Sequence, residues 1–343
     1  MSISLQNVIK RFHGAAAVDG VSAEAPTGAF FAVLGPSGCG KSTLLRLIAG
    51  LERLDGGSVA LDGAAVAGPR LHVPPEARRA GVVFQSYALW PHMTVAENVA
   101  FPAETAGLPP AAVRASRDRA LAAVSMTALA GRRPAELSGG QRQRVALARC
   151  LAQSARTILM DEPLANLDPH LRAAMEGELL AFHRAAGATT LYITHDQREA
   201  MALADLVAVM RAGRFEQVAP PETVYARPAT EHVARFIGRA AVIPAELSPE
   251  GPGRARALGA EVRTAEQAAA GPARIVFRPE DVALGEGPGA RPSVLRAVAY
   301  RGGFWEAEAV VADWPEPLPV ASRARIAEGE TAPLRITGGW ALP

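Results

Sequence analysis

Short hydrophobic runs alternate with longer mixed stretches over roughly the first 238 residues of the chain. Four of these runs are almost continuously apolar: 29–34 (AFFAVL), 81–84 (GVVF), 157–160 (TILM) and 190–194 (TLYIT). Such runs are typical of parallel strands that are covered on both faces. The stretches between them include helix candidates at 42–51 and 141–152. Strand and helix therefore alternate, which predicts an α/β core with a mostly parallel sheet.

The stretch between Gln85 and Ser138 breaks this alternation. It is rich in Ala and Arg, which favour helix, and the pair Pro109-Pro110 interrupts it. We therefore expect a helical subdomain, at about residues 86–157, inserted into the α/β core.

The composition changes again after Gly238. Prolines and glycines at positions 244, 249 and 251–253 predict a linker. Beyond it, the short alternating stretches 273–277 and 294–300 lie between Gly/Pro turns and predict a small β-barrel. The expected division is an α/β domain over residues 1–238 and a C-terminal domain over residues 239–343.

Composition and charge narrow the class of protein. A hydrophobic fraction of 49% and a charged fraction of 20% are those of a globular protein, and a net charge of +2 does not predict nucleic-acid binding. No apolar run reaches the roughly 18 residues that a membrane-spanning helix needs, and the first residues do not resemble a signal peptide. Two cysteines form neither a disulfide framework nor a metal cluster. We expect a protein of the cytoplasm that a partner can hold at a membrane.

Lysine is unusually scarce. Only Lys10 and Lys41 occur, so that 34 of the 36 basic residues are arginine. In such a chain, a lysine indicates a site that the planar guanidinium of arginine cannot serve, such as a phosphate cradle.

The second lysine lies in a glycine-rich segment that follows an apolar run and opens a helix candidate. The segment fits the phosphate-loop pattern G-x-x-x-x-G-K-[ST] with Gly35, Pro36, Ser37, Gly38, Cys39, Gly40, Lys41, Ser42 and Thr43. Glycines let backbone N–H groups surround phosphate oxygens, and the helix N-terminus adds partial positive charge. We expect Lys41 to bridge the β- and γ-phosphates and the Ser42 hydroxyl to ligate Mg²⁺. The alternative is a glycine-rich turn that binds nothing.

Polar residues follow three other apolar runs. Asp161 and Glu162 come after 157–160, His195 after 190–194 and Gln85 after 81–84. Because ligands of parallel sheets bind at the carboxyl ends of the strands, these side chains are expected beside the phosphate loop. Asp161 would hold Mg²⁺, Glu162 would act as general base, His195 would contact the γ-phosphate, and Gln85 would reach the metal and the attacking water. Solvated acids, a structural histidine and a surface glutamine are the alternatives.

A further segment, Leu137 to Gln141 (LSGGQ), predicts the start of a helix. Ser138 and Gln141 have the spacing of a capping box. Gly139 and Gly140 cost roughly 1 kcal/mol each against alanine in a helix, which makes sense if bare backbone has to approach an anion. The alternative is a helix start without a ligand.

Taken together, the phosphate loop, LSGGQ and the following MDEP (160–163) closely resemble ABC ATPases. The resemblance implies two subunits that sandwich two ATP molecules, with Ser138, Gly139, Gly140 and Gln141 facing the nucleotide held by the other subunit. One copy of each motif in the chain implies that a second subunit, here a second copy, completes the site.

Other positions match the family residue by residue. Phe12 matches the aromatic residue that stacks on adenine, with Val18 beside it, although Phe12 could also be a core aromatic residue. Asp168 ends the segment Ala165-Asn-Leu-Asp, whose usual form begins with serine. The resemblance therefore implies that one hydroxyl across the dimer is missing here, with looser coupling between the two sites.

The segments 87–95, 194–197, 199–201, 234–238 and 277–281 resemble the importer branch that serves sugars, polyamines, sulfate and ferric iron. ALWPHMTV is most similar to ferric-iron members, and Phe277-Arg-Pro-Glu-Asp281 to the start of an OB-like regulatory domain. The resemblance implies ATP and Mg²⁺ as ligands, membrane permease subunits and a periplasmic or surface substrate-binding protein as partners, and a peripheral location on the cytoplasmic face of the bacterial inner membrane. Import of polyamine, sugar, sulfate or phosphonate stays open, as does a soluble ABC ATPase.

Two local expectations complete the sequence analysis. Tyr87, Leu89 and Trp90 form a stretch too apolar for an ordinary exposed loop, and are expected either to line a groove for a permease helix or to pack internally. Cys39 lies at a helix N-terminus near Lys41, which predicts a thiol pKa below the free value of about 8.5. Cys150 is expected to be buried and slow to react.

Overall fold

The computed structural model describes residues 2–153, 155–165, 169–265 and 268–343. The chain divides into two compact units, Met1–Pro221 and Glu222–Pro343. We describe each unit by itself.

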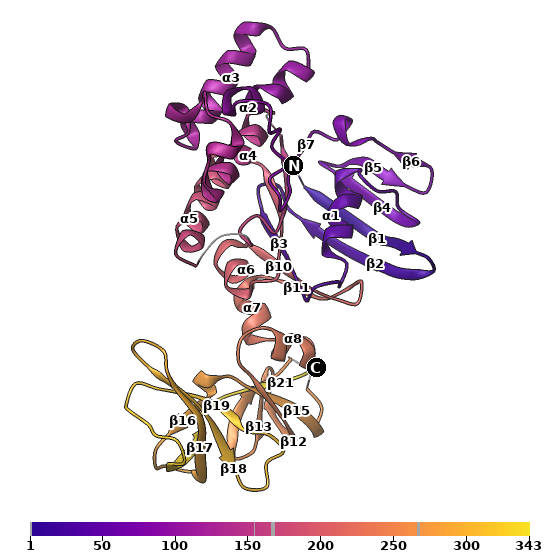
Figure 1. Cartoon of the computed structure of the whole chain (residues 1–343). Helices are drawn as coiled ribbons and strands as arrows, with labels where there is room; N and C mark the ends of the chain where they lie inside the picture. The colour runs from indigo at the N-terminus through magenta and orange to yellow at the C-terminus, as the bar shows by residue number, and fades with distance from the viewer. Residues whose placement is uncertain (1, 154, 166–168, 266–267) are drawn as a thin grey trace. The chain divides into compact units, whose positions relative to one another are not determined.

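A mostly parallel sheet runs through the first unit (Figure 1). Its strands are β3 (Phe30–Leu34), β7 (Ala80–Val83), β8 (Thr157–Asp161), β9 (Thr189–Thr194), β10 (Leu206–Arg211) and β11 (Arg214–Ala219). They lie in the order β11–β10–β3–β9–β8–β7, and only β11 pairs antiparallel to its neighbour. The four apolar runs of the sequence are thus β3, β7, β8 and β9, as predicted.

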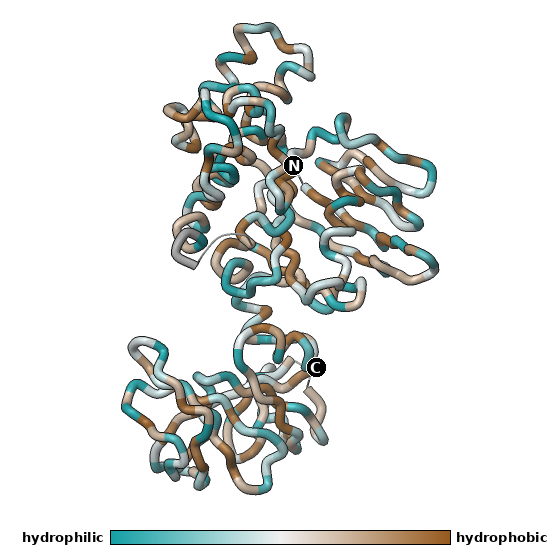
Figure 2. The backbone as a smooth tube through the Cα atoms, in the orientation of Figure 1, coloured by the Kyte–Doolittle hydropathy of each residue, from teal (hydrophilic) through white to brown (hydrophobic). Residues whose placement is uncertain are grey.

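A second, antiparallel sheet lies in the order β2–β1–β4–β5–β6. Its strands are β1 (Ile3–Phe12), β2 (Ala15–Ala25), β4 (Gly56–Leu61), β5 (Ala64–Gly68) and β6 (Leu71–His72). Leu44, Leu45, Leu47 and Ile48 of helix α1 (Lys41–Ala49) are fully buried in the core between the two sheets. Figure 2 shows hydrophobic residues concentrated along the strands, with hydrophilic turns outside. This core fixes the helix that carries the phosphate loop.

Helices cover the other face of the central sheet, and those within residues 86–157 form the predicted helical insertion (Figure 1). Together, these helices are α2 (Val95–Thr105), α3 (Pro110–Ala123), α4 (Gly139–Ala152), α5 (Pro169–Ala186) and α6 (Gln197–Leu203), with 3₁₀ turns at Pro75–Ala77, Thr127–Leu129 and Pro134–Glu136. Thr94 begins α2 with a capping box, since its hydroxyl accepts from the Glu97 amide while the Glu97 carboxylate accepts from the Thr94 amide. Val95, Val99, Leu121 and Val145 form the core of the insertion.

The second unit is a β domain with two short helices. Its elements are α7 (Pro221–Ala226), α8 (Glu231–Phe236), β12 (Ala241–Gly251), β13 (Arg254–Ala257), β14 (Ala260–Arg263), β15 (Gly271–Phe277), a 3₁₀ turn (Pro279–Asp281), β16 (Val282–Leu284), β17 (Arg291–Tyr300), β18 (Trp305–Val311), β19 (Leu318–Ser322), β20 (Thr331–Ile336) and β21 (Trp340–Ala341). A closed barrel forms in the order β12–β13–β14–β21–β15, beside a sheet in the order β16–β20–β17–β18–β19. The predicted fold class, an α/β core with a C-terminal barrel, is confirmed.

The predicted linker is wrong, because Pro244 and Pro249 lie in strand β12. Ala241, Ile243 and Leu247 alternate into the barrel core, and Pro244 is exposed on the opposite face. β12 pairs with β15 up to Leu247 and with β13 from Ser248 onward. Alternation of buried residues outweighs the proline signal, since proline is tolerated where a strand needs no donor.

Arg278 explains why the compact unit begins before Gly238. Its guanidinium is 2% exposed and donates to the carbonyls of Tyr225 (3.0 Å), Ala234 (2.9 Å) and Arg239 (3.2 Å), as well as Ile237. A buried cation without such acceptors would be very costly. Arg278 therefore holds α7 and α8 on the barrel, and β12 to β15 precede the FRPED segment that we expected at the domain's start.

Candidate nucleotide-binding site

The candidate site lies where the parallel strands end. Leu34 of β3 is paired with Thr194 of β9, and Asp161 of β8 with Ile193 of β9, while Val83 of β7 is paired with Met160 of β8. The residues that follow these strand ends share one edge of the sheet, as the hydrophobic runs predict. This edge carries the start of the phosphate loop together with Glu162, His195 and Gln85.

The phosphate loop requires glycine at both of its ends. A Cβ at Gly35 would lie 2.2 Å from the Met210 carbonyl oxygen, and a Cβ at Gly40 would lie 2.1 Å from the Ala17 carbonyl oxygen. Gly40 also has φ 110°, in the left-handed region, and directly precedes the first residue of α1. Backbone packing therefore fixes the loop against β2 and β10 and aims the N-terminus of α1 along it.

Lys41 is held inside this loop. Its side chain is 5% exposed, and its Nζ donates to the carbonyl oxygens of Gly35 (2.7 Å) and Pro36 (3.0 Å). These two bonds fold the ammonium back over the loop that the backbone N–H groups line. Pro36, Ser37 and Gly38 are exposed at its mouth.

Ser42 and Asp161 are joined directly. The Ser42 hydroxyl donates to Asp161 Oδ1 at 2.9 Å, linking the start of α1 to the end of β8. Burial raises the pKa of the Asp161 carboxyl, and the hydrogen bond from Ser42 opposes that shift. A hydroxyl and a carboxylate beside a phosphate loop are the oxygen ligands that suit Mg²⁺, which keeps waters and phosphates as its other ligands. The described residues contain no group of three or more His, Cys, Asp or Glu side chains that could hold a metal.

Glu162 and His195 form the second contact at this edge. His195 Nδ1 lies 3.1 Å from Glu162 Oε1, with exposed side-chain fractions of 53% and 21%. Glu162 has φ 46°, which is uncommon for a residue with a side chain, and its amide donates to the Ile193 carbonyl at 3.0 Å. Such backbone strain occurs at functional sites where the surrounding structure enforces it. It turns the Glu162 carboxylate from the strand end toward His195.

The turn that carries His195 is fixed by residues that the sequence analysis did not single out. Glu199 is 3% exposed, and its Oε2 accepts hydrogen bonds from the hydroxyls of Tyr192 (2.8 Å) and Thr194 (2.6 Å). Arg172 of α5 reaches Asp196 Oδ2 at 3.0 Å and lies 3.7 Å from Glu199 Oε1. The available signal was a glutamate four residues after the histidine, which the structure places on the buried side of α6.

The signature segment lies at the N-terminus of α4. The Ser138 hydroxyl accepts from the Gln141 amide at 3.3 Å, and Gln141 Oε1 accepts from the Ser138 amide at 2.9 Å, so the predicted capping box is present. Ser138 is exposed, Gly139 is half-buried, and Gly140 is buried. The exposed helix N-terminus can receive an anion from outside the chain.

Gln85 is exposed two residues after Val83, the last residue of β7. Contacts from α4 fix the segment that follows it. Arg149 of α4 donates to the Tyr87 carbonyl at 3.1 Å and the Ala88 carbonyl at 2.7 Å, and its guanidinium lies 5.0 Å from the Trp90 ring centroid. Tyr87 is 6% exposed and packs in the core. The expectation of Tyr87 in a docking groove is therefore wrong, because its ring fills the interior, while half-buried Trp90 remains beside exposed Ala88.

Phe12 is exposed rather than part of the core, and Val18 is the reverse. The Phe12 ring is 42% exposed at the end of β1, and Val18 on β2 is fully buried. The alternative of a core aromatic residue at Phe12 is therefore wrong. The Val18 side chain has no surface to offer a nucleotide, because it packs between the sheets.

Cys39 differs from the sequence expectation. Burial raises the pKa of its thiol, and nearby Lys41 only partly offsets this. The thiol is 5% exposed, so desolvation of the thiolate outweighs the positive charge and the helix N-terminus. Cys150 is buried as expected, and burial raises the pKa of its thiol to about 11.

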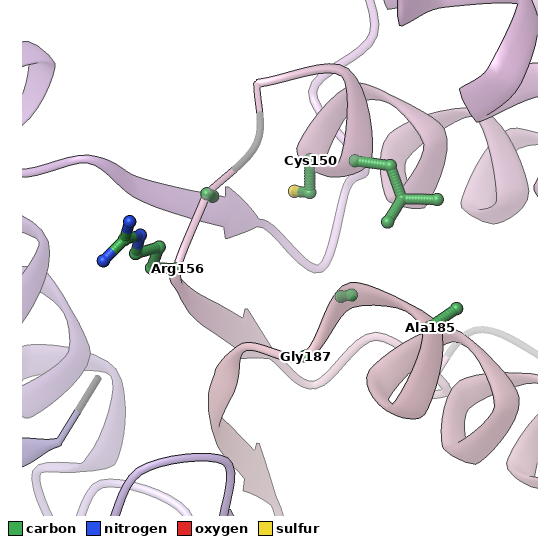
Figure 3. A pocket seen from close by; sticks show the side chains of 7 residues that line it. Cys150, Arg156, Ala185 and Gly187 are labelled. Atoms are coloured by element: carbon green, nitrogen blue, oxygen red, sulfur yellow. The ribbon is translucent and has the colours of Figure 1, made fainter.

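Asp168 falls outside the described residues, and Ala165 before it donates its amide to the Glu162 carbonyl at 3.2 Å. Figure 3 shows Cys150, Arg156, Ala185 and Gly187 around a hollow of about 490 Å³. Arg156 and Gly187 come just before β8 and β9, so this hollow lies at the amino ends of the strands, opposite the phosphate loop.

Comparison with known proteins defines the class that this fold and site represent. The family model described as ABC transporter matches residues 18–165. The spermidine/putrescine import ATP-binding protein PotA of Pseudomonas aeruginosa is 48% identical over 245 residues, which cover 71% of this chain and 66% of that protein. PotA of Pseudomonas fluorescens is 48% identical over 251 residues, covering 72% of this chain and 68% of that protein. The sn-glycerol-3-phosphate import ATP-binding protein UgpC 1 of Rhizobium johnstonii is 47% identical over 240 residues, which cover 70% of this chain and 64% of that protein.

A solved structure is similar to the first unit. The ATP-binding cassette MJ0796, solved as a dimer in a post-hydrolysis state with ADP and Pi, has a TM-score of 0.56 and 29% sequence identity. The match covers 64% of this chain and 98% of that one.

The chain belongs to the ABC transporter family. The predicted ABC-type ATPase and its similarity to importer subunits are confirmed. The matched regions span about two thirds of the length of these curated relatives. None of the three relatives compared above is named for ferric iron, so the ferric-iron resemblance is not supported. Among the described residues, no helix has the length and apolar character to cross a membrane.

Proposed function

We propose that this chain binds and hydrolyses ATP to drive an ABC importer for a small organic solute. The observation that carries this proposal is the shared edge where Lys41, the Ser42–Asp161 pair and the Glu162–His195 pair lie. Each group matches a different need of phosphoryl transfer: charge, metal ligands and a base.

In this proposal the triphosphate of ATP binds along the phosphate loop, with backbone N–H groups and Lys41 around it. Ser42 and Asp161 fit a Mg²⁺ ion bound with the nucleotide, and Gln85 is the third expected ligand. When bound, Mg²⁺ neutralises charge on the phosphate oxygens.

In this proposal Glu162 accepts a proton from the attacking water. The His195 ring is proposed to orient that carboxylate through Nδ1, which lies 3.1 Å from Glu162 Oε1, and to contact the γ-phosphate through its other nitrogen, Nε2. The strained turn at Glu162 and the bonds around Glu199 hold the two groups in place before nucleotide arrives.

A second copy of the chain completes each site in this proposal. Ser138 and the glycines after it form an exposed helix N-terminus that is suited to the γ-phosphate on the other subunit. MJ0796, which is similar over the first unit, is a dimer in its solved structure. Asp168 is proposed to take part in the same interface.

The permease contact is proposed at the surface after Gln85. Ala88, Leu89 and Trp90 follow it, with Leu89 and Trp90 half-buried. Arg149 and the fully buried Asn98, whose Oδ1 accepts from the Trp90 amide at 2.9 Å, fix this segment to the helical insertion. Motion of the insertion therefore moves the proposed docking surface.

Solute, location and further partners follow from the importer relatives. PotA proteins are named for spermidine and putrescine, and UgpC 1 for sn-glycerol-3-phosphate. We propose a solute of one of these two classes, delivered by a substrate-binding protein to permease subunits, with this chain on the cytoplasmic face of the inner membrane and the C-terminal domain regulating it.

The test is Glu162→Gln, with exposed Glu76→Gln as the matched control. Loss of the base is expected to slow ATP hydrolysis by about 10² to 10⁴-fold while ATP binding persists. Cells carrying the intact transporter with Glu162→Gln are expected to stop taking up labelled putrescine or glycerol 3-phosphate, and Glu76→Gln is expected to behave as wild type. An unchanged rate of ATP hydrolysis in Glu162→Gln would refute the catalytic assignment. Cells with the wild-type transporter that take up neither solute would refute the solute class.

A further inference from the structure

Lys10 is the one lysine that the proposed site does not use. It lies on β1 and is 8% exposed, and its Nζ is 2.9 Å from Glu52 Oε1 and 3.5 Å from Asp55 Oδ1. Two carboxylates thus hold one ammonium group in place. These contacts raise the Lys10 pKa although its burial opposes the shift, so the side chain is charged.

The same ammonium lies over the Phe12 ring, 5.1 Å from its centroid. A cation at this distance attracts the π-face of an aromatic ring and restricts its orientation. Phe12 is still 42% exposed, so its ring keeps surface for a stacking partner. A compact ammonium on a flexible stem has three rotatable donors and can serve two carboxylates and a ring face together.

The carboxylates also connect this ring to the phosphate-binding helix. Glu52 and Asp55 follow Gly50, which ends α1. Asp55 clasps the end of β1, since its Oδ2 accepts from the Arg11 amide at 2.6 Å and its amide donates to the Ile9 carbonyl at 2.9 Å. The end of β1 is thereby fixed relative to the helix that begins at the phosphate loop.

We propose that Lys10 is a positioning residue for the nucleobase: it fixes the Phe12 ring so that adenine stacks on the exposed surface of that ring. This proposal rests on the proposed function, because it needs ATP in the phosphate loop. Lys10 then contributes to base affinity and leaves the phosphate chemistry unchanged.

The experiment compares Mg-ATP with Mg-tripolyphosphate, which has no nucleobase. Binding of both is measured by calorimetry for wild type, Lys10→Met, Phe12→Ala and the double variant, with steady-state ATPase alongside. Arg53→Met, which removes an exposed charge from the same loop, is the matched control. Thermal unfolding of each variant identifies loss of structure.

Lys10→Met is expected to weaken ATP binding and raise KM about three- to tenfold, with kcat and tripolyphosphate affinity unchanged. It should add nothing in the Phe12→Ala background, and Arg53→Met should behave as wild type. An equal loss of affinity for both ligands, or a fall in kcat with KM unchanged, would overturn the proposal. If Lys10→Met does not fold, Glu52→Gln is expected to show the same selective loss for ATP, and its absence would overturn the proposal too. Wild type that binds neither ligand would refute the proposed function itself.

Discussion

Arg78 is the position where a single substitution should most clearly separate the phosphate-binding helix from its support. Its guanidinium is 3% exposed and lies at the C-terminal end of α1. Nη1 donates to the carbonyls of Leu47 (2.7 Å) and Ile48 (2.8 Å), and Nε donates to the Val73 carbonyl (2.7 Å). A cation at this end of a helix also complements the helix dipole.

The cost of Arg78→Ala follows from these contacts. Hydrogen bonds to charged groups contribute about 1.5–3 kcal/mol each, but three bonds from one side chain are not additive. Removal leaves buried carbonyls and a void beside Gly50, where a Cβ would already lie 2.5 Å from Arg78 Nε. We expect a loss of about 3–5 kcal/mol in the free energy of unfolding of the first unit, or roughly 10 °C in Tm.

The assay is urea unfolding with hydrogen exchange read on peptides from α1, which reports the first unit alone. Arg70→Ala, an exposed arginine in the preceding segment, is the control and should remain within about 0.5 kcal/mol of wild type. Arg78→Lys should recover only part of the loss, because one nitrogen cannot reach carbonyls on both segments. An Arg78→Ala protein within about 1 kcal/mol of wild type would refute this reasoning.

Two further predictions concern the site. Because burial raises the Cys39 pKa, less thiolate is present at any pH below that pKa than in a free thiol, so maleimide labelling of a Cys150→Ala variant should rise only at higher pH than that of glutathione. Labelling of Cys39 that rises at the same pH as that of glutathione, or at a lower pH, would contradict this. Glu199→Leu should loosen the His195 turn and lower kcat by about 10- to 100-fold with little change in KM for ATP, as measured by steady-state ATPase, and an unaltered kcat would show that Glu199 does not position His195.

Much of this fold and site follows from local sequence pattern. Continuous apolar runs gave β3, β7, β8 and β9, because strands buried on both faces leave no polar alternation. Ser138 and Gln141 formed their capping box as predicted, since both partners lie within one helical turn. The polar residues after each run fall at one sheet edge because parallel strands end together.

Other features depended on residues that are distant in the sequence. Tyr87 is buried because α4 and β8 pack over it, and the prolines of β12 belong to a strand because the barrel core selects Ala241, Ile243 and Leu247. Neither neighbour is visible in a local window.

The sequence by itself determined the strands of the central sheet and the chemistry available at its edge, since both depend on spacing within a few residues. Only the tertiary structure decided which charged groups form ion pairs and which ionisable groups are desolvated. The pKa of Cys39 is raised because the fold desolvates its thiol, and Lys10 acquires its partners because the loop after α1 returns to β1. Desolvation and long-range pairing depend on how the whole chain packs, and so no short pattern encodes them.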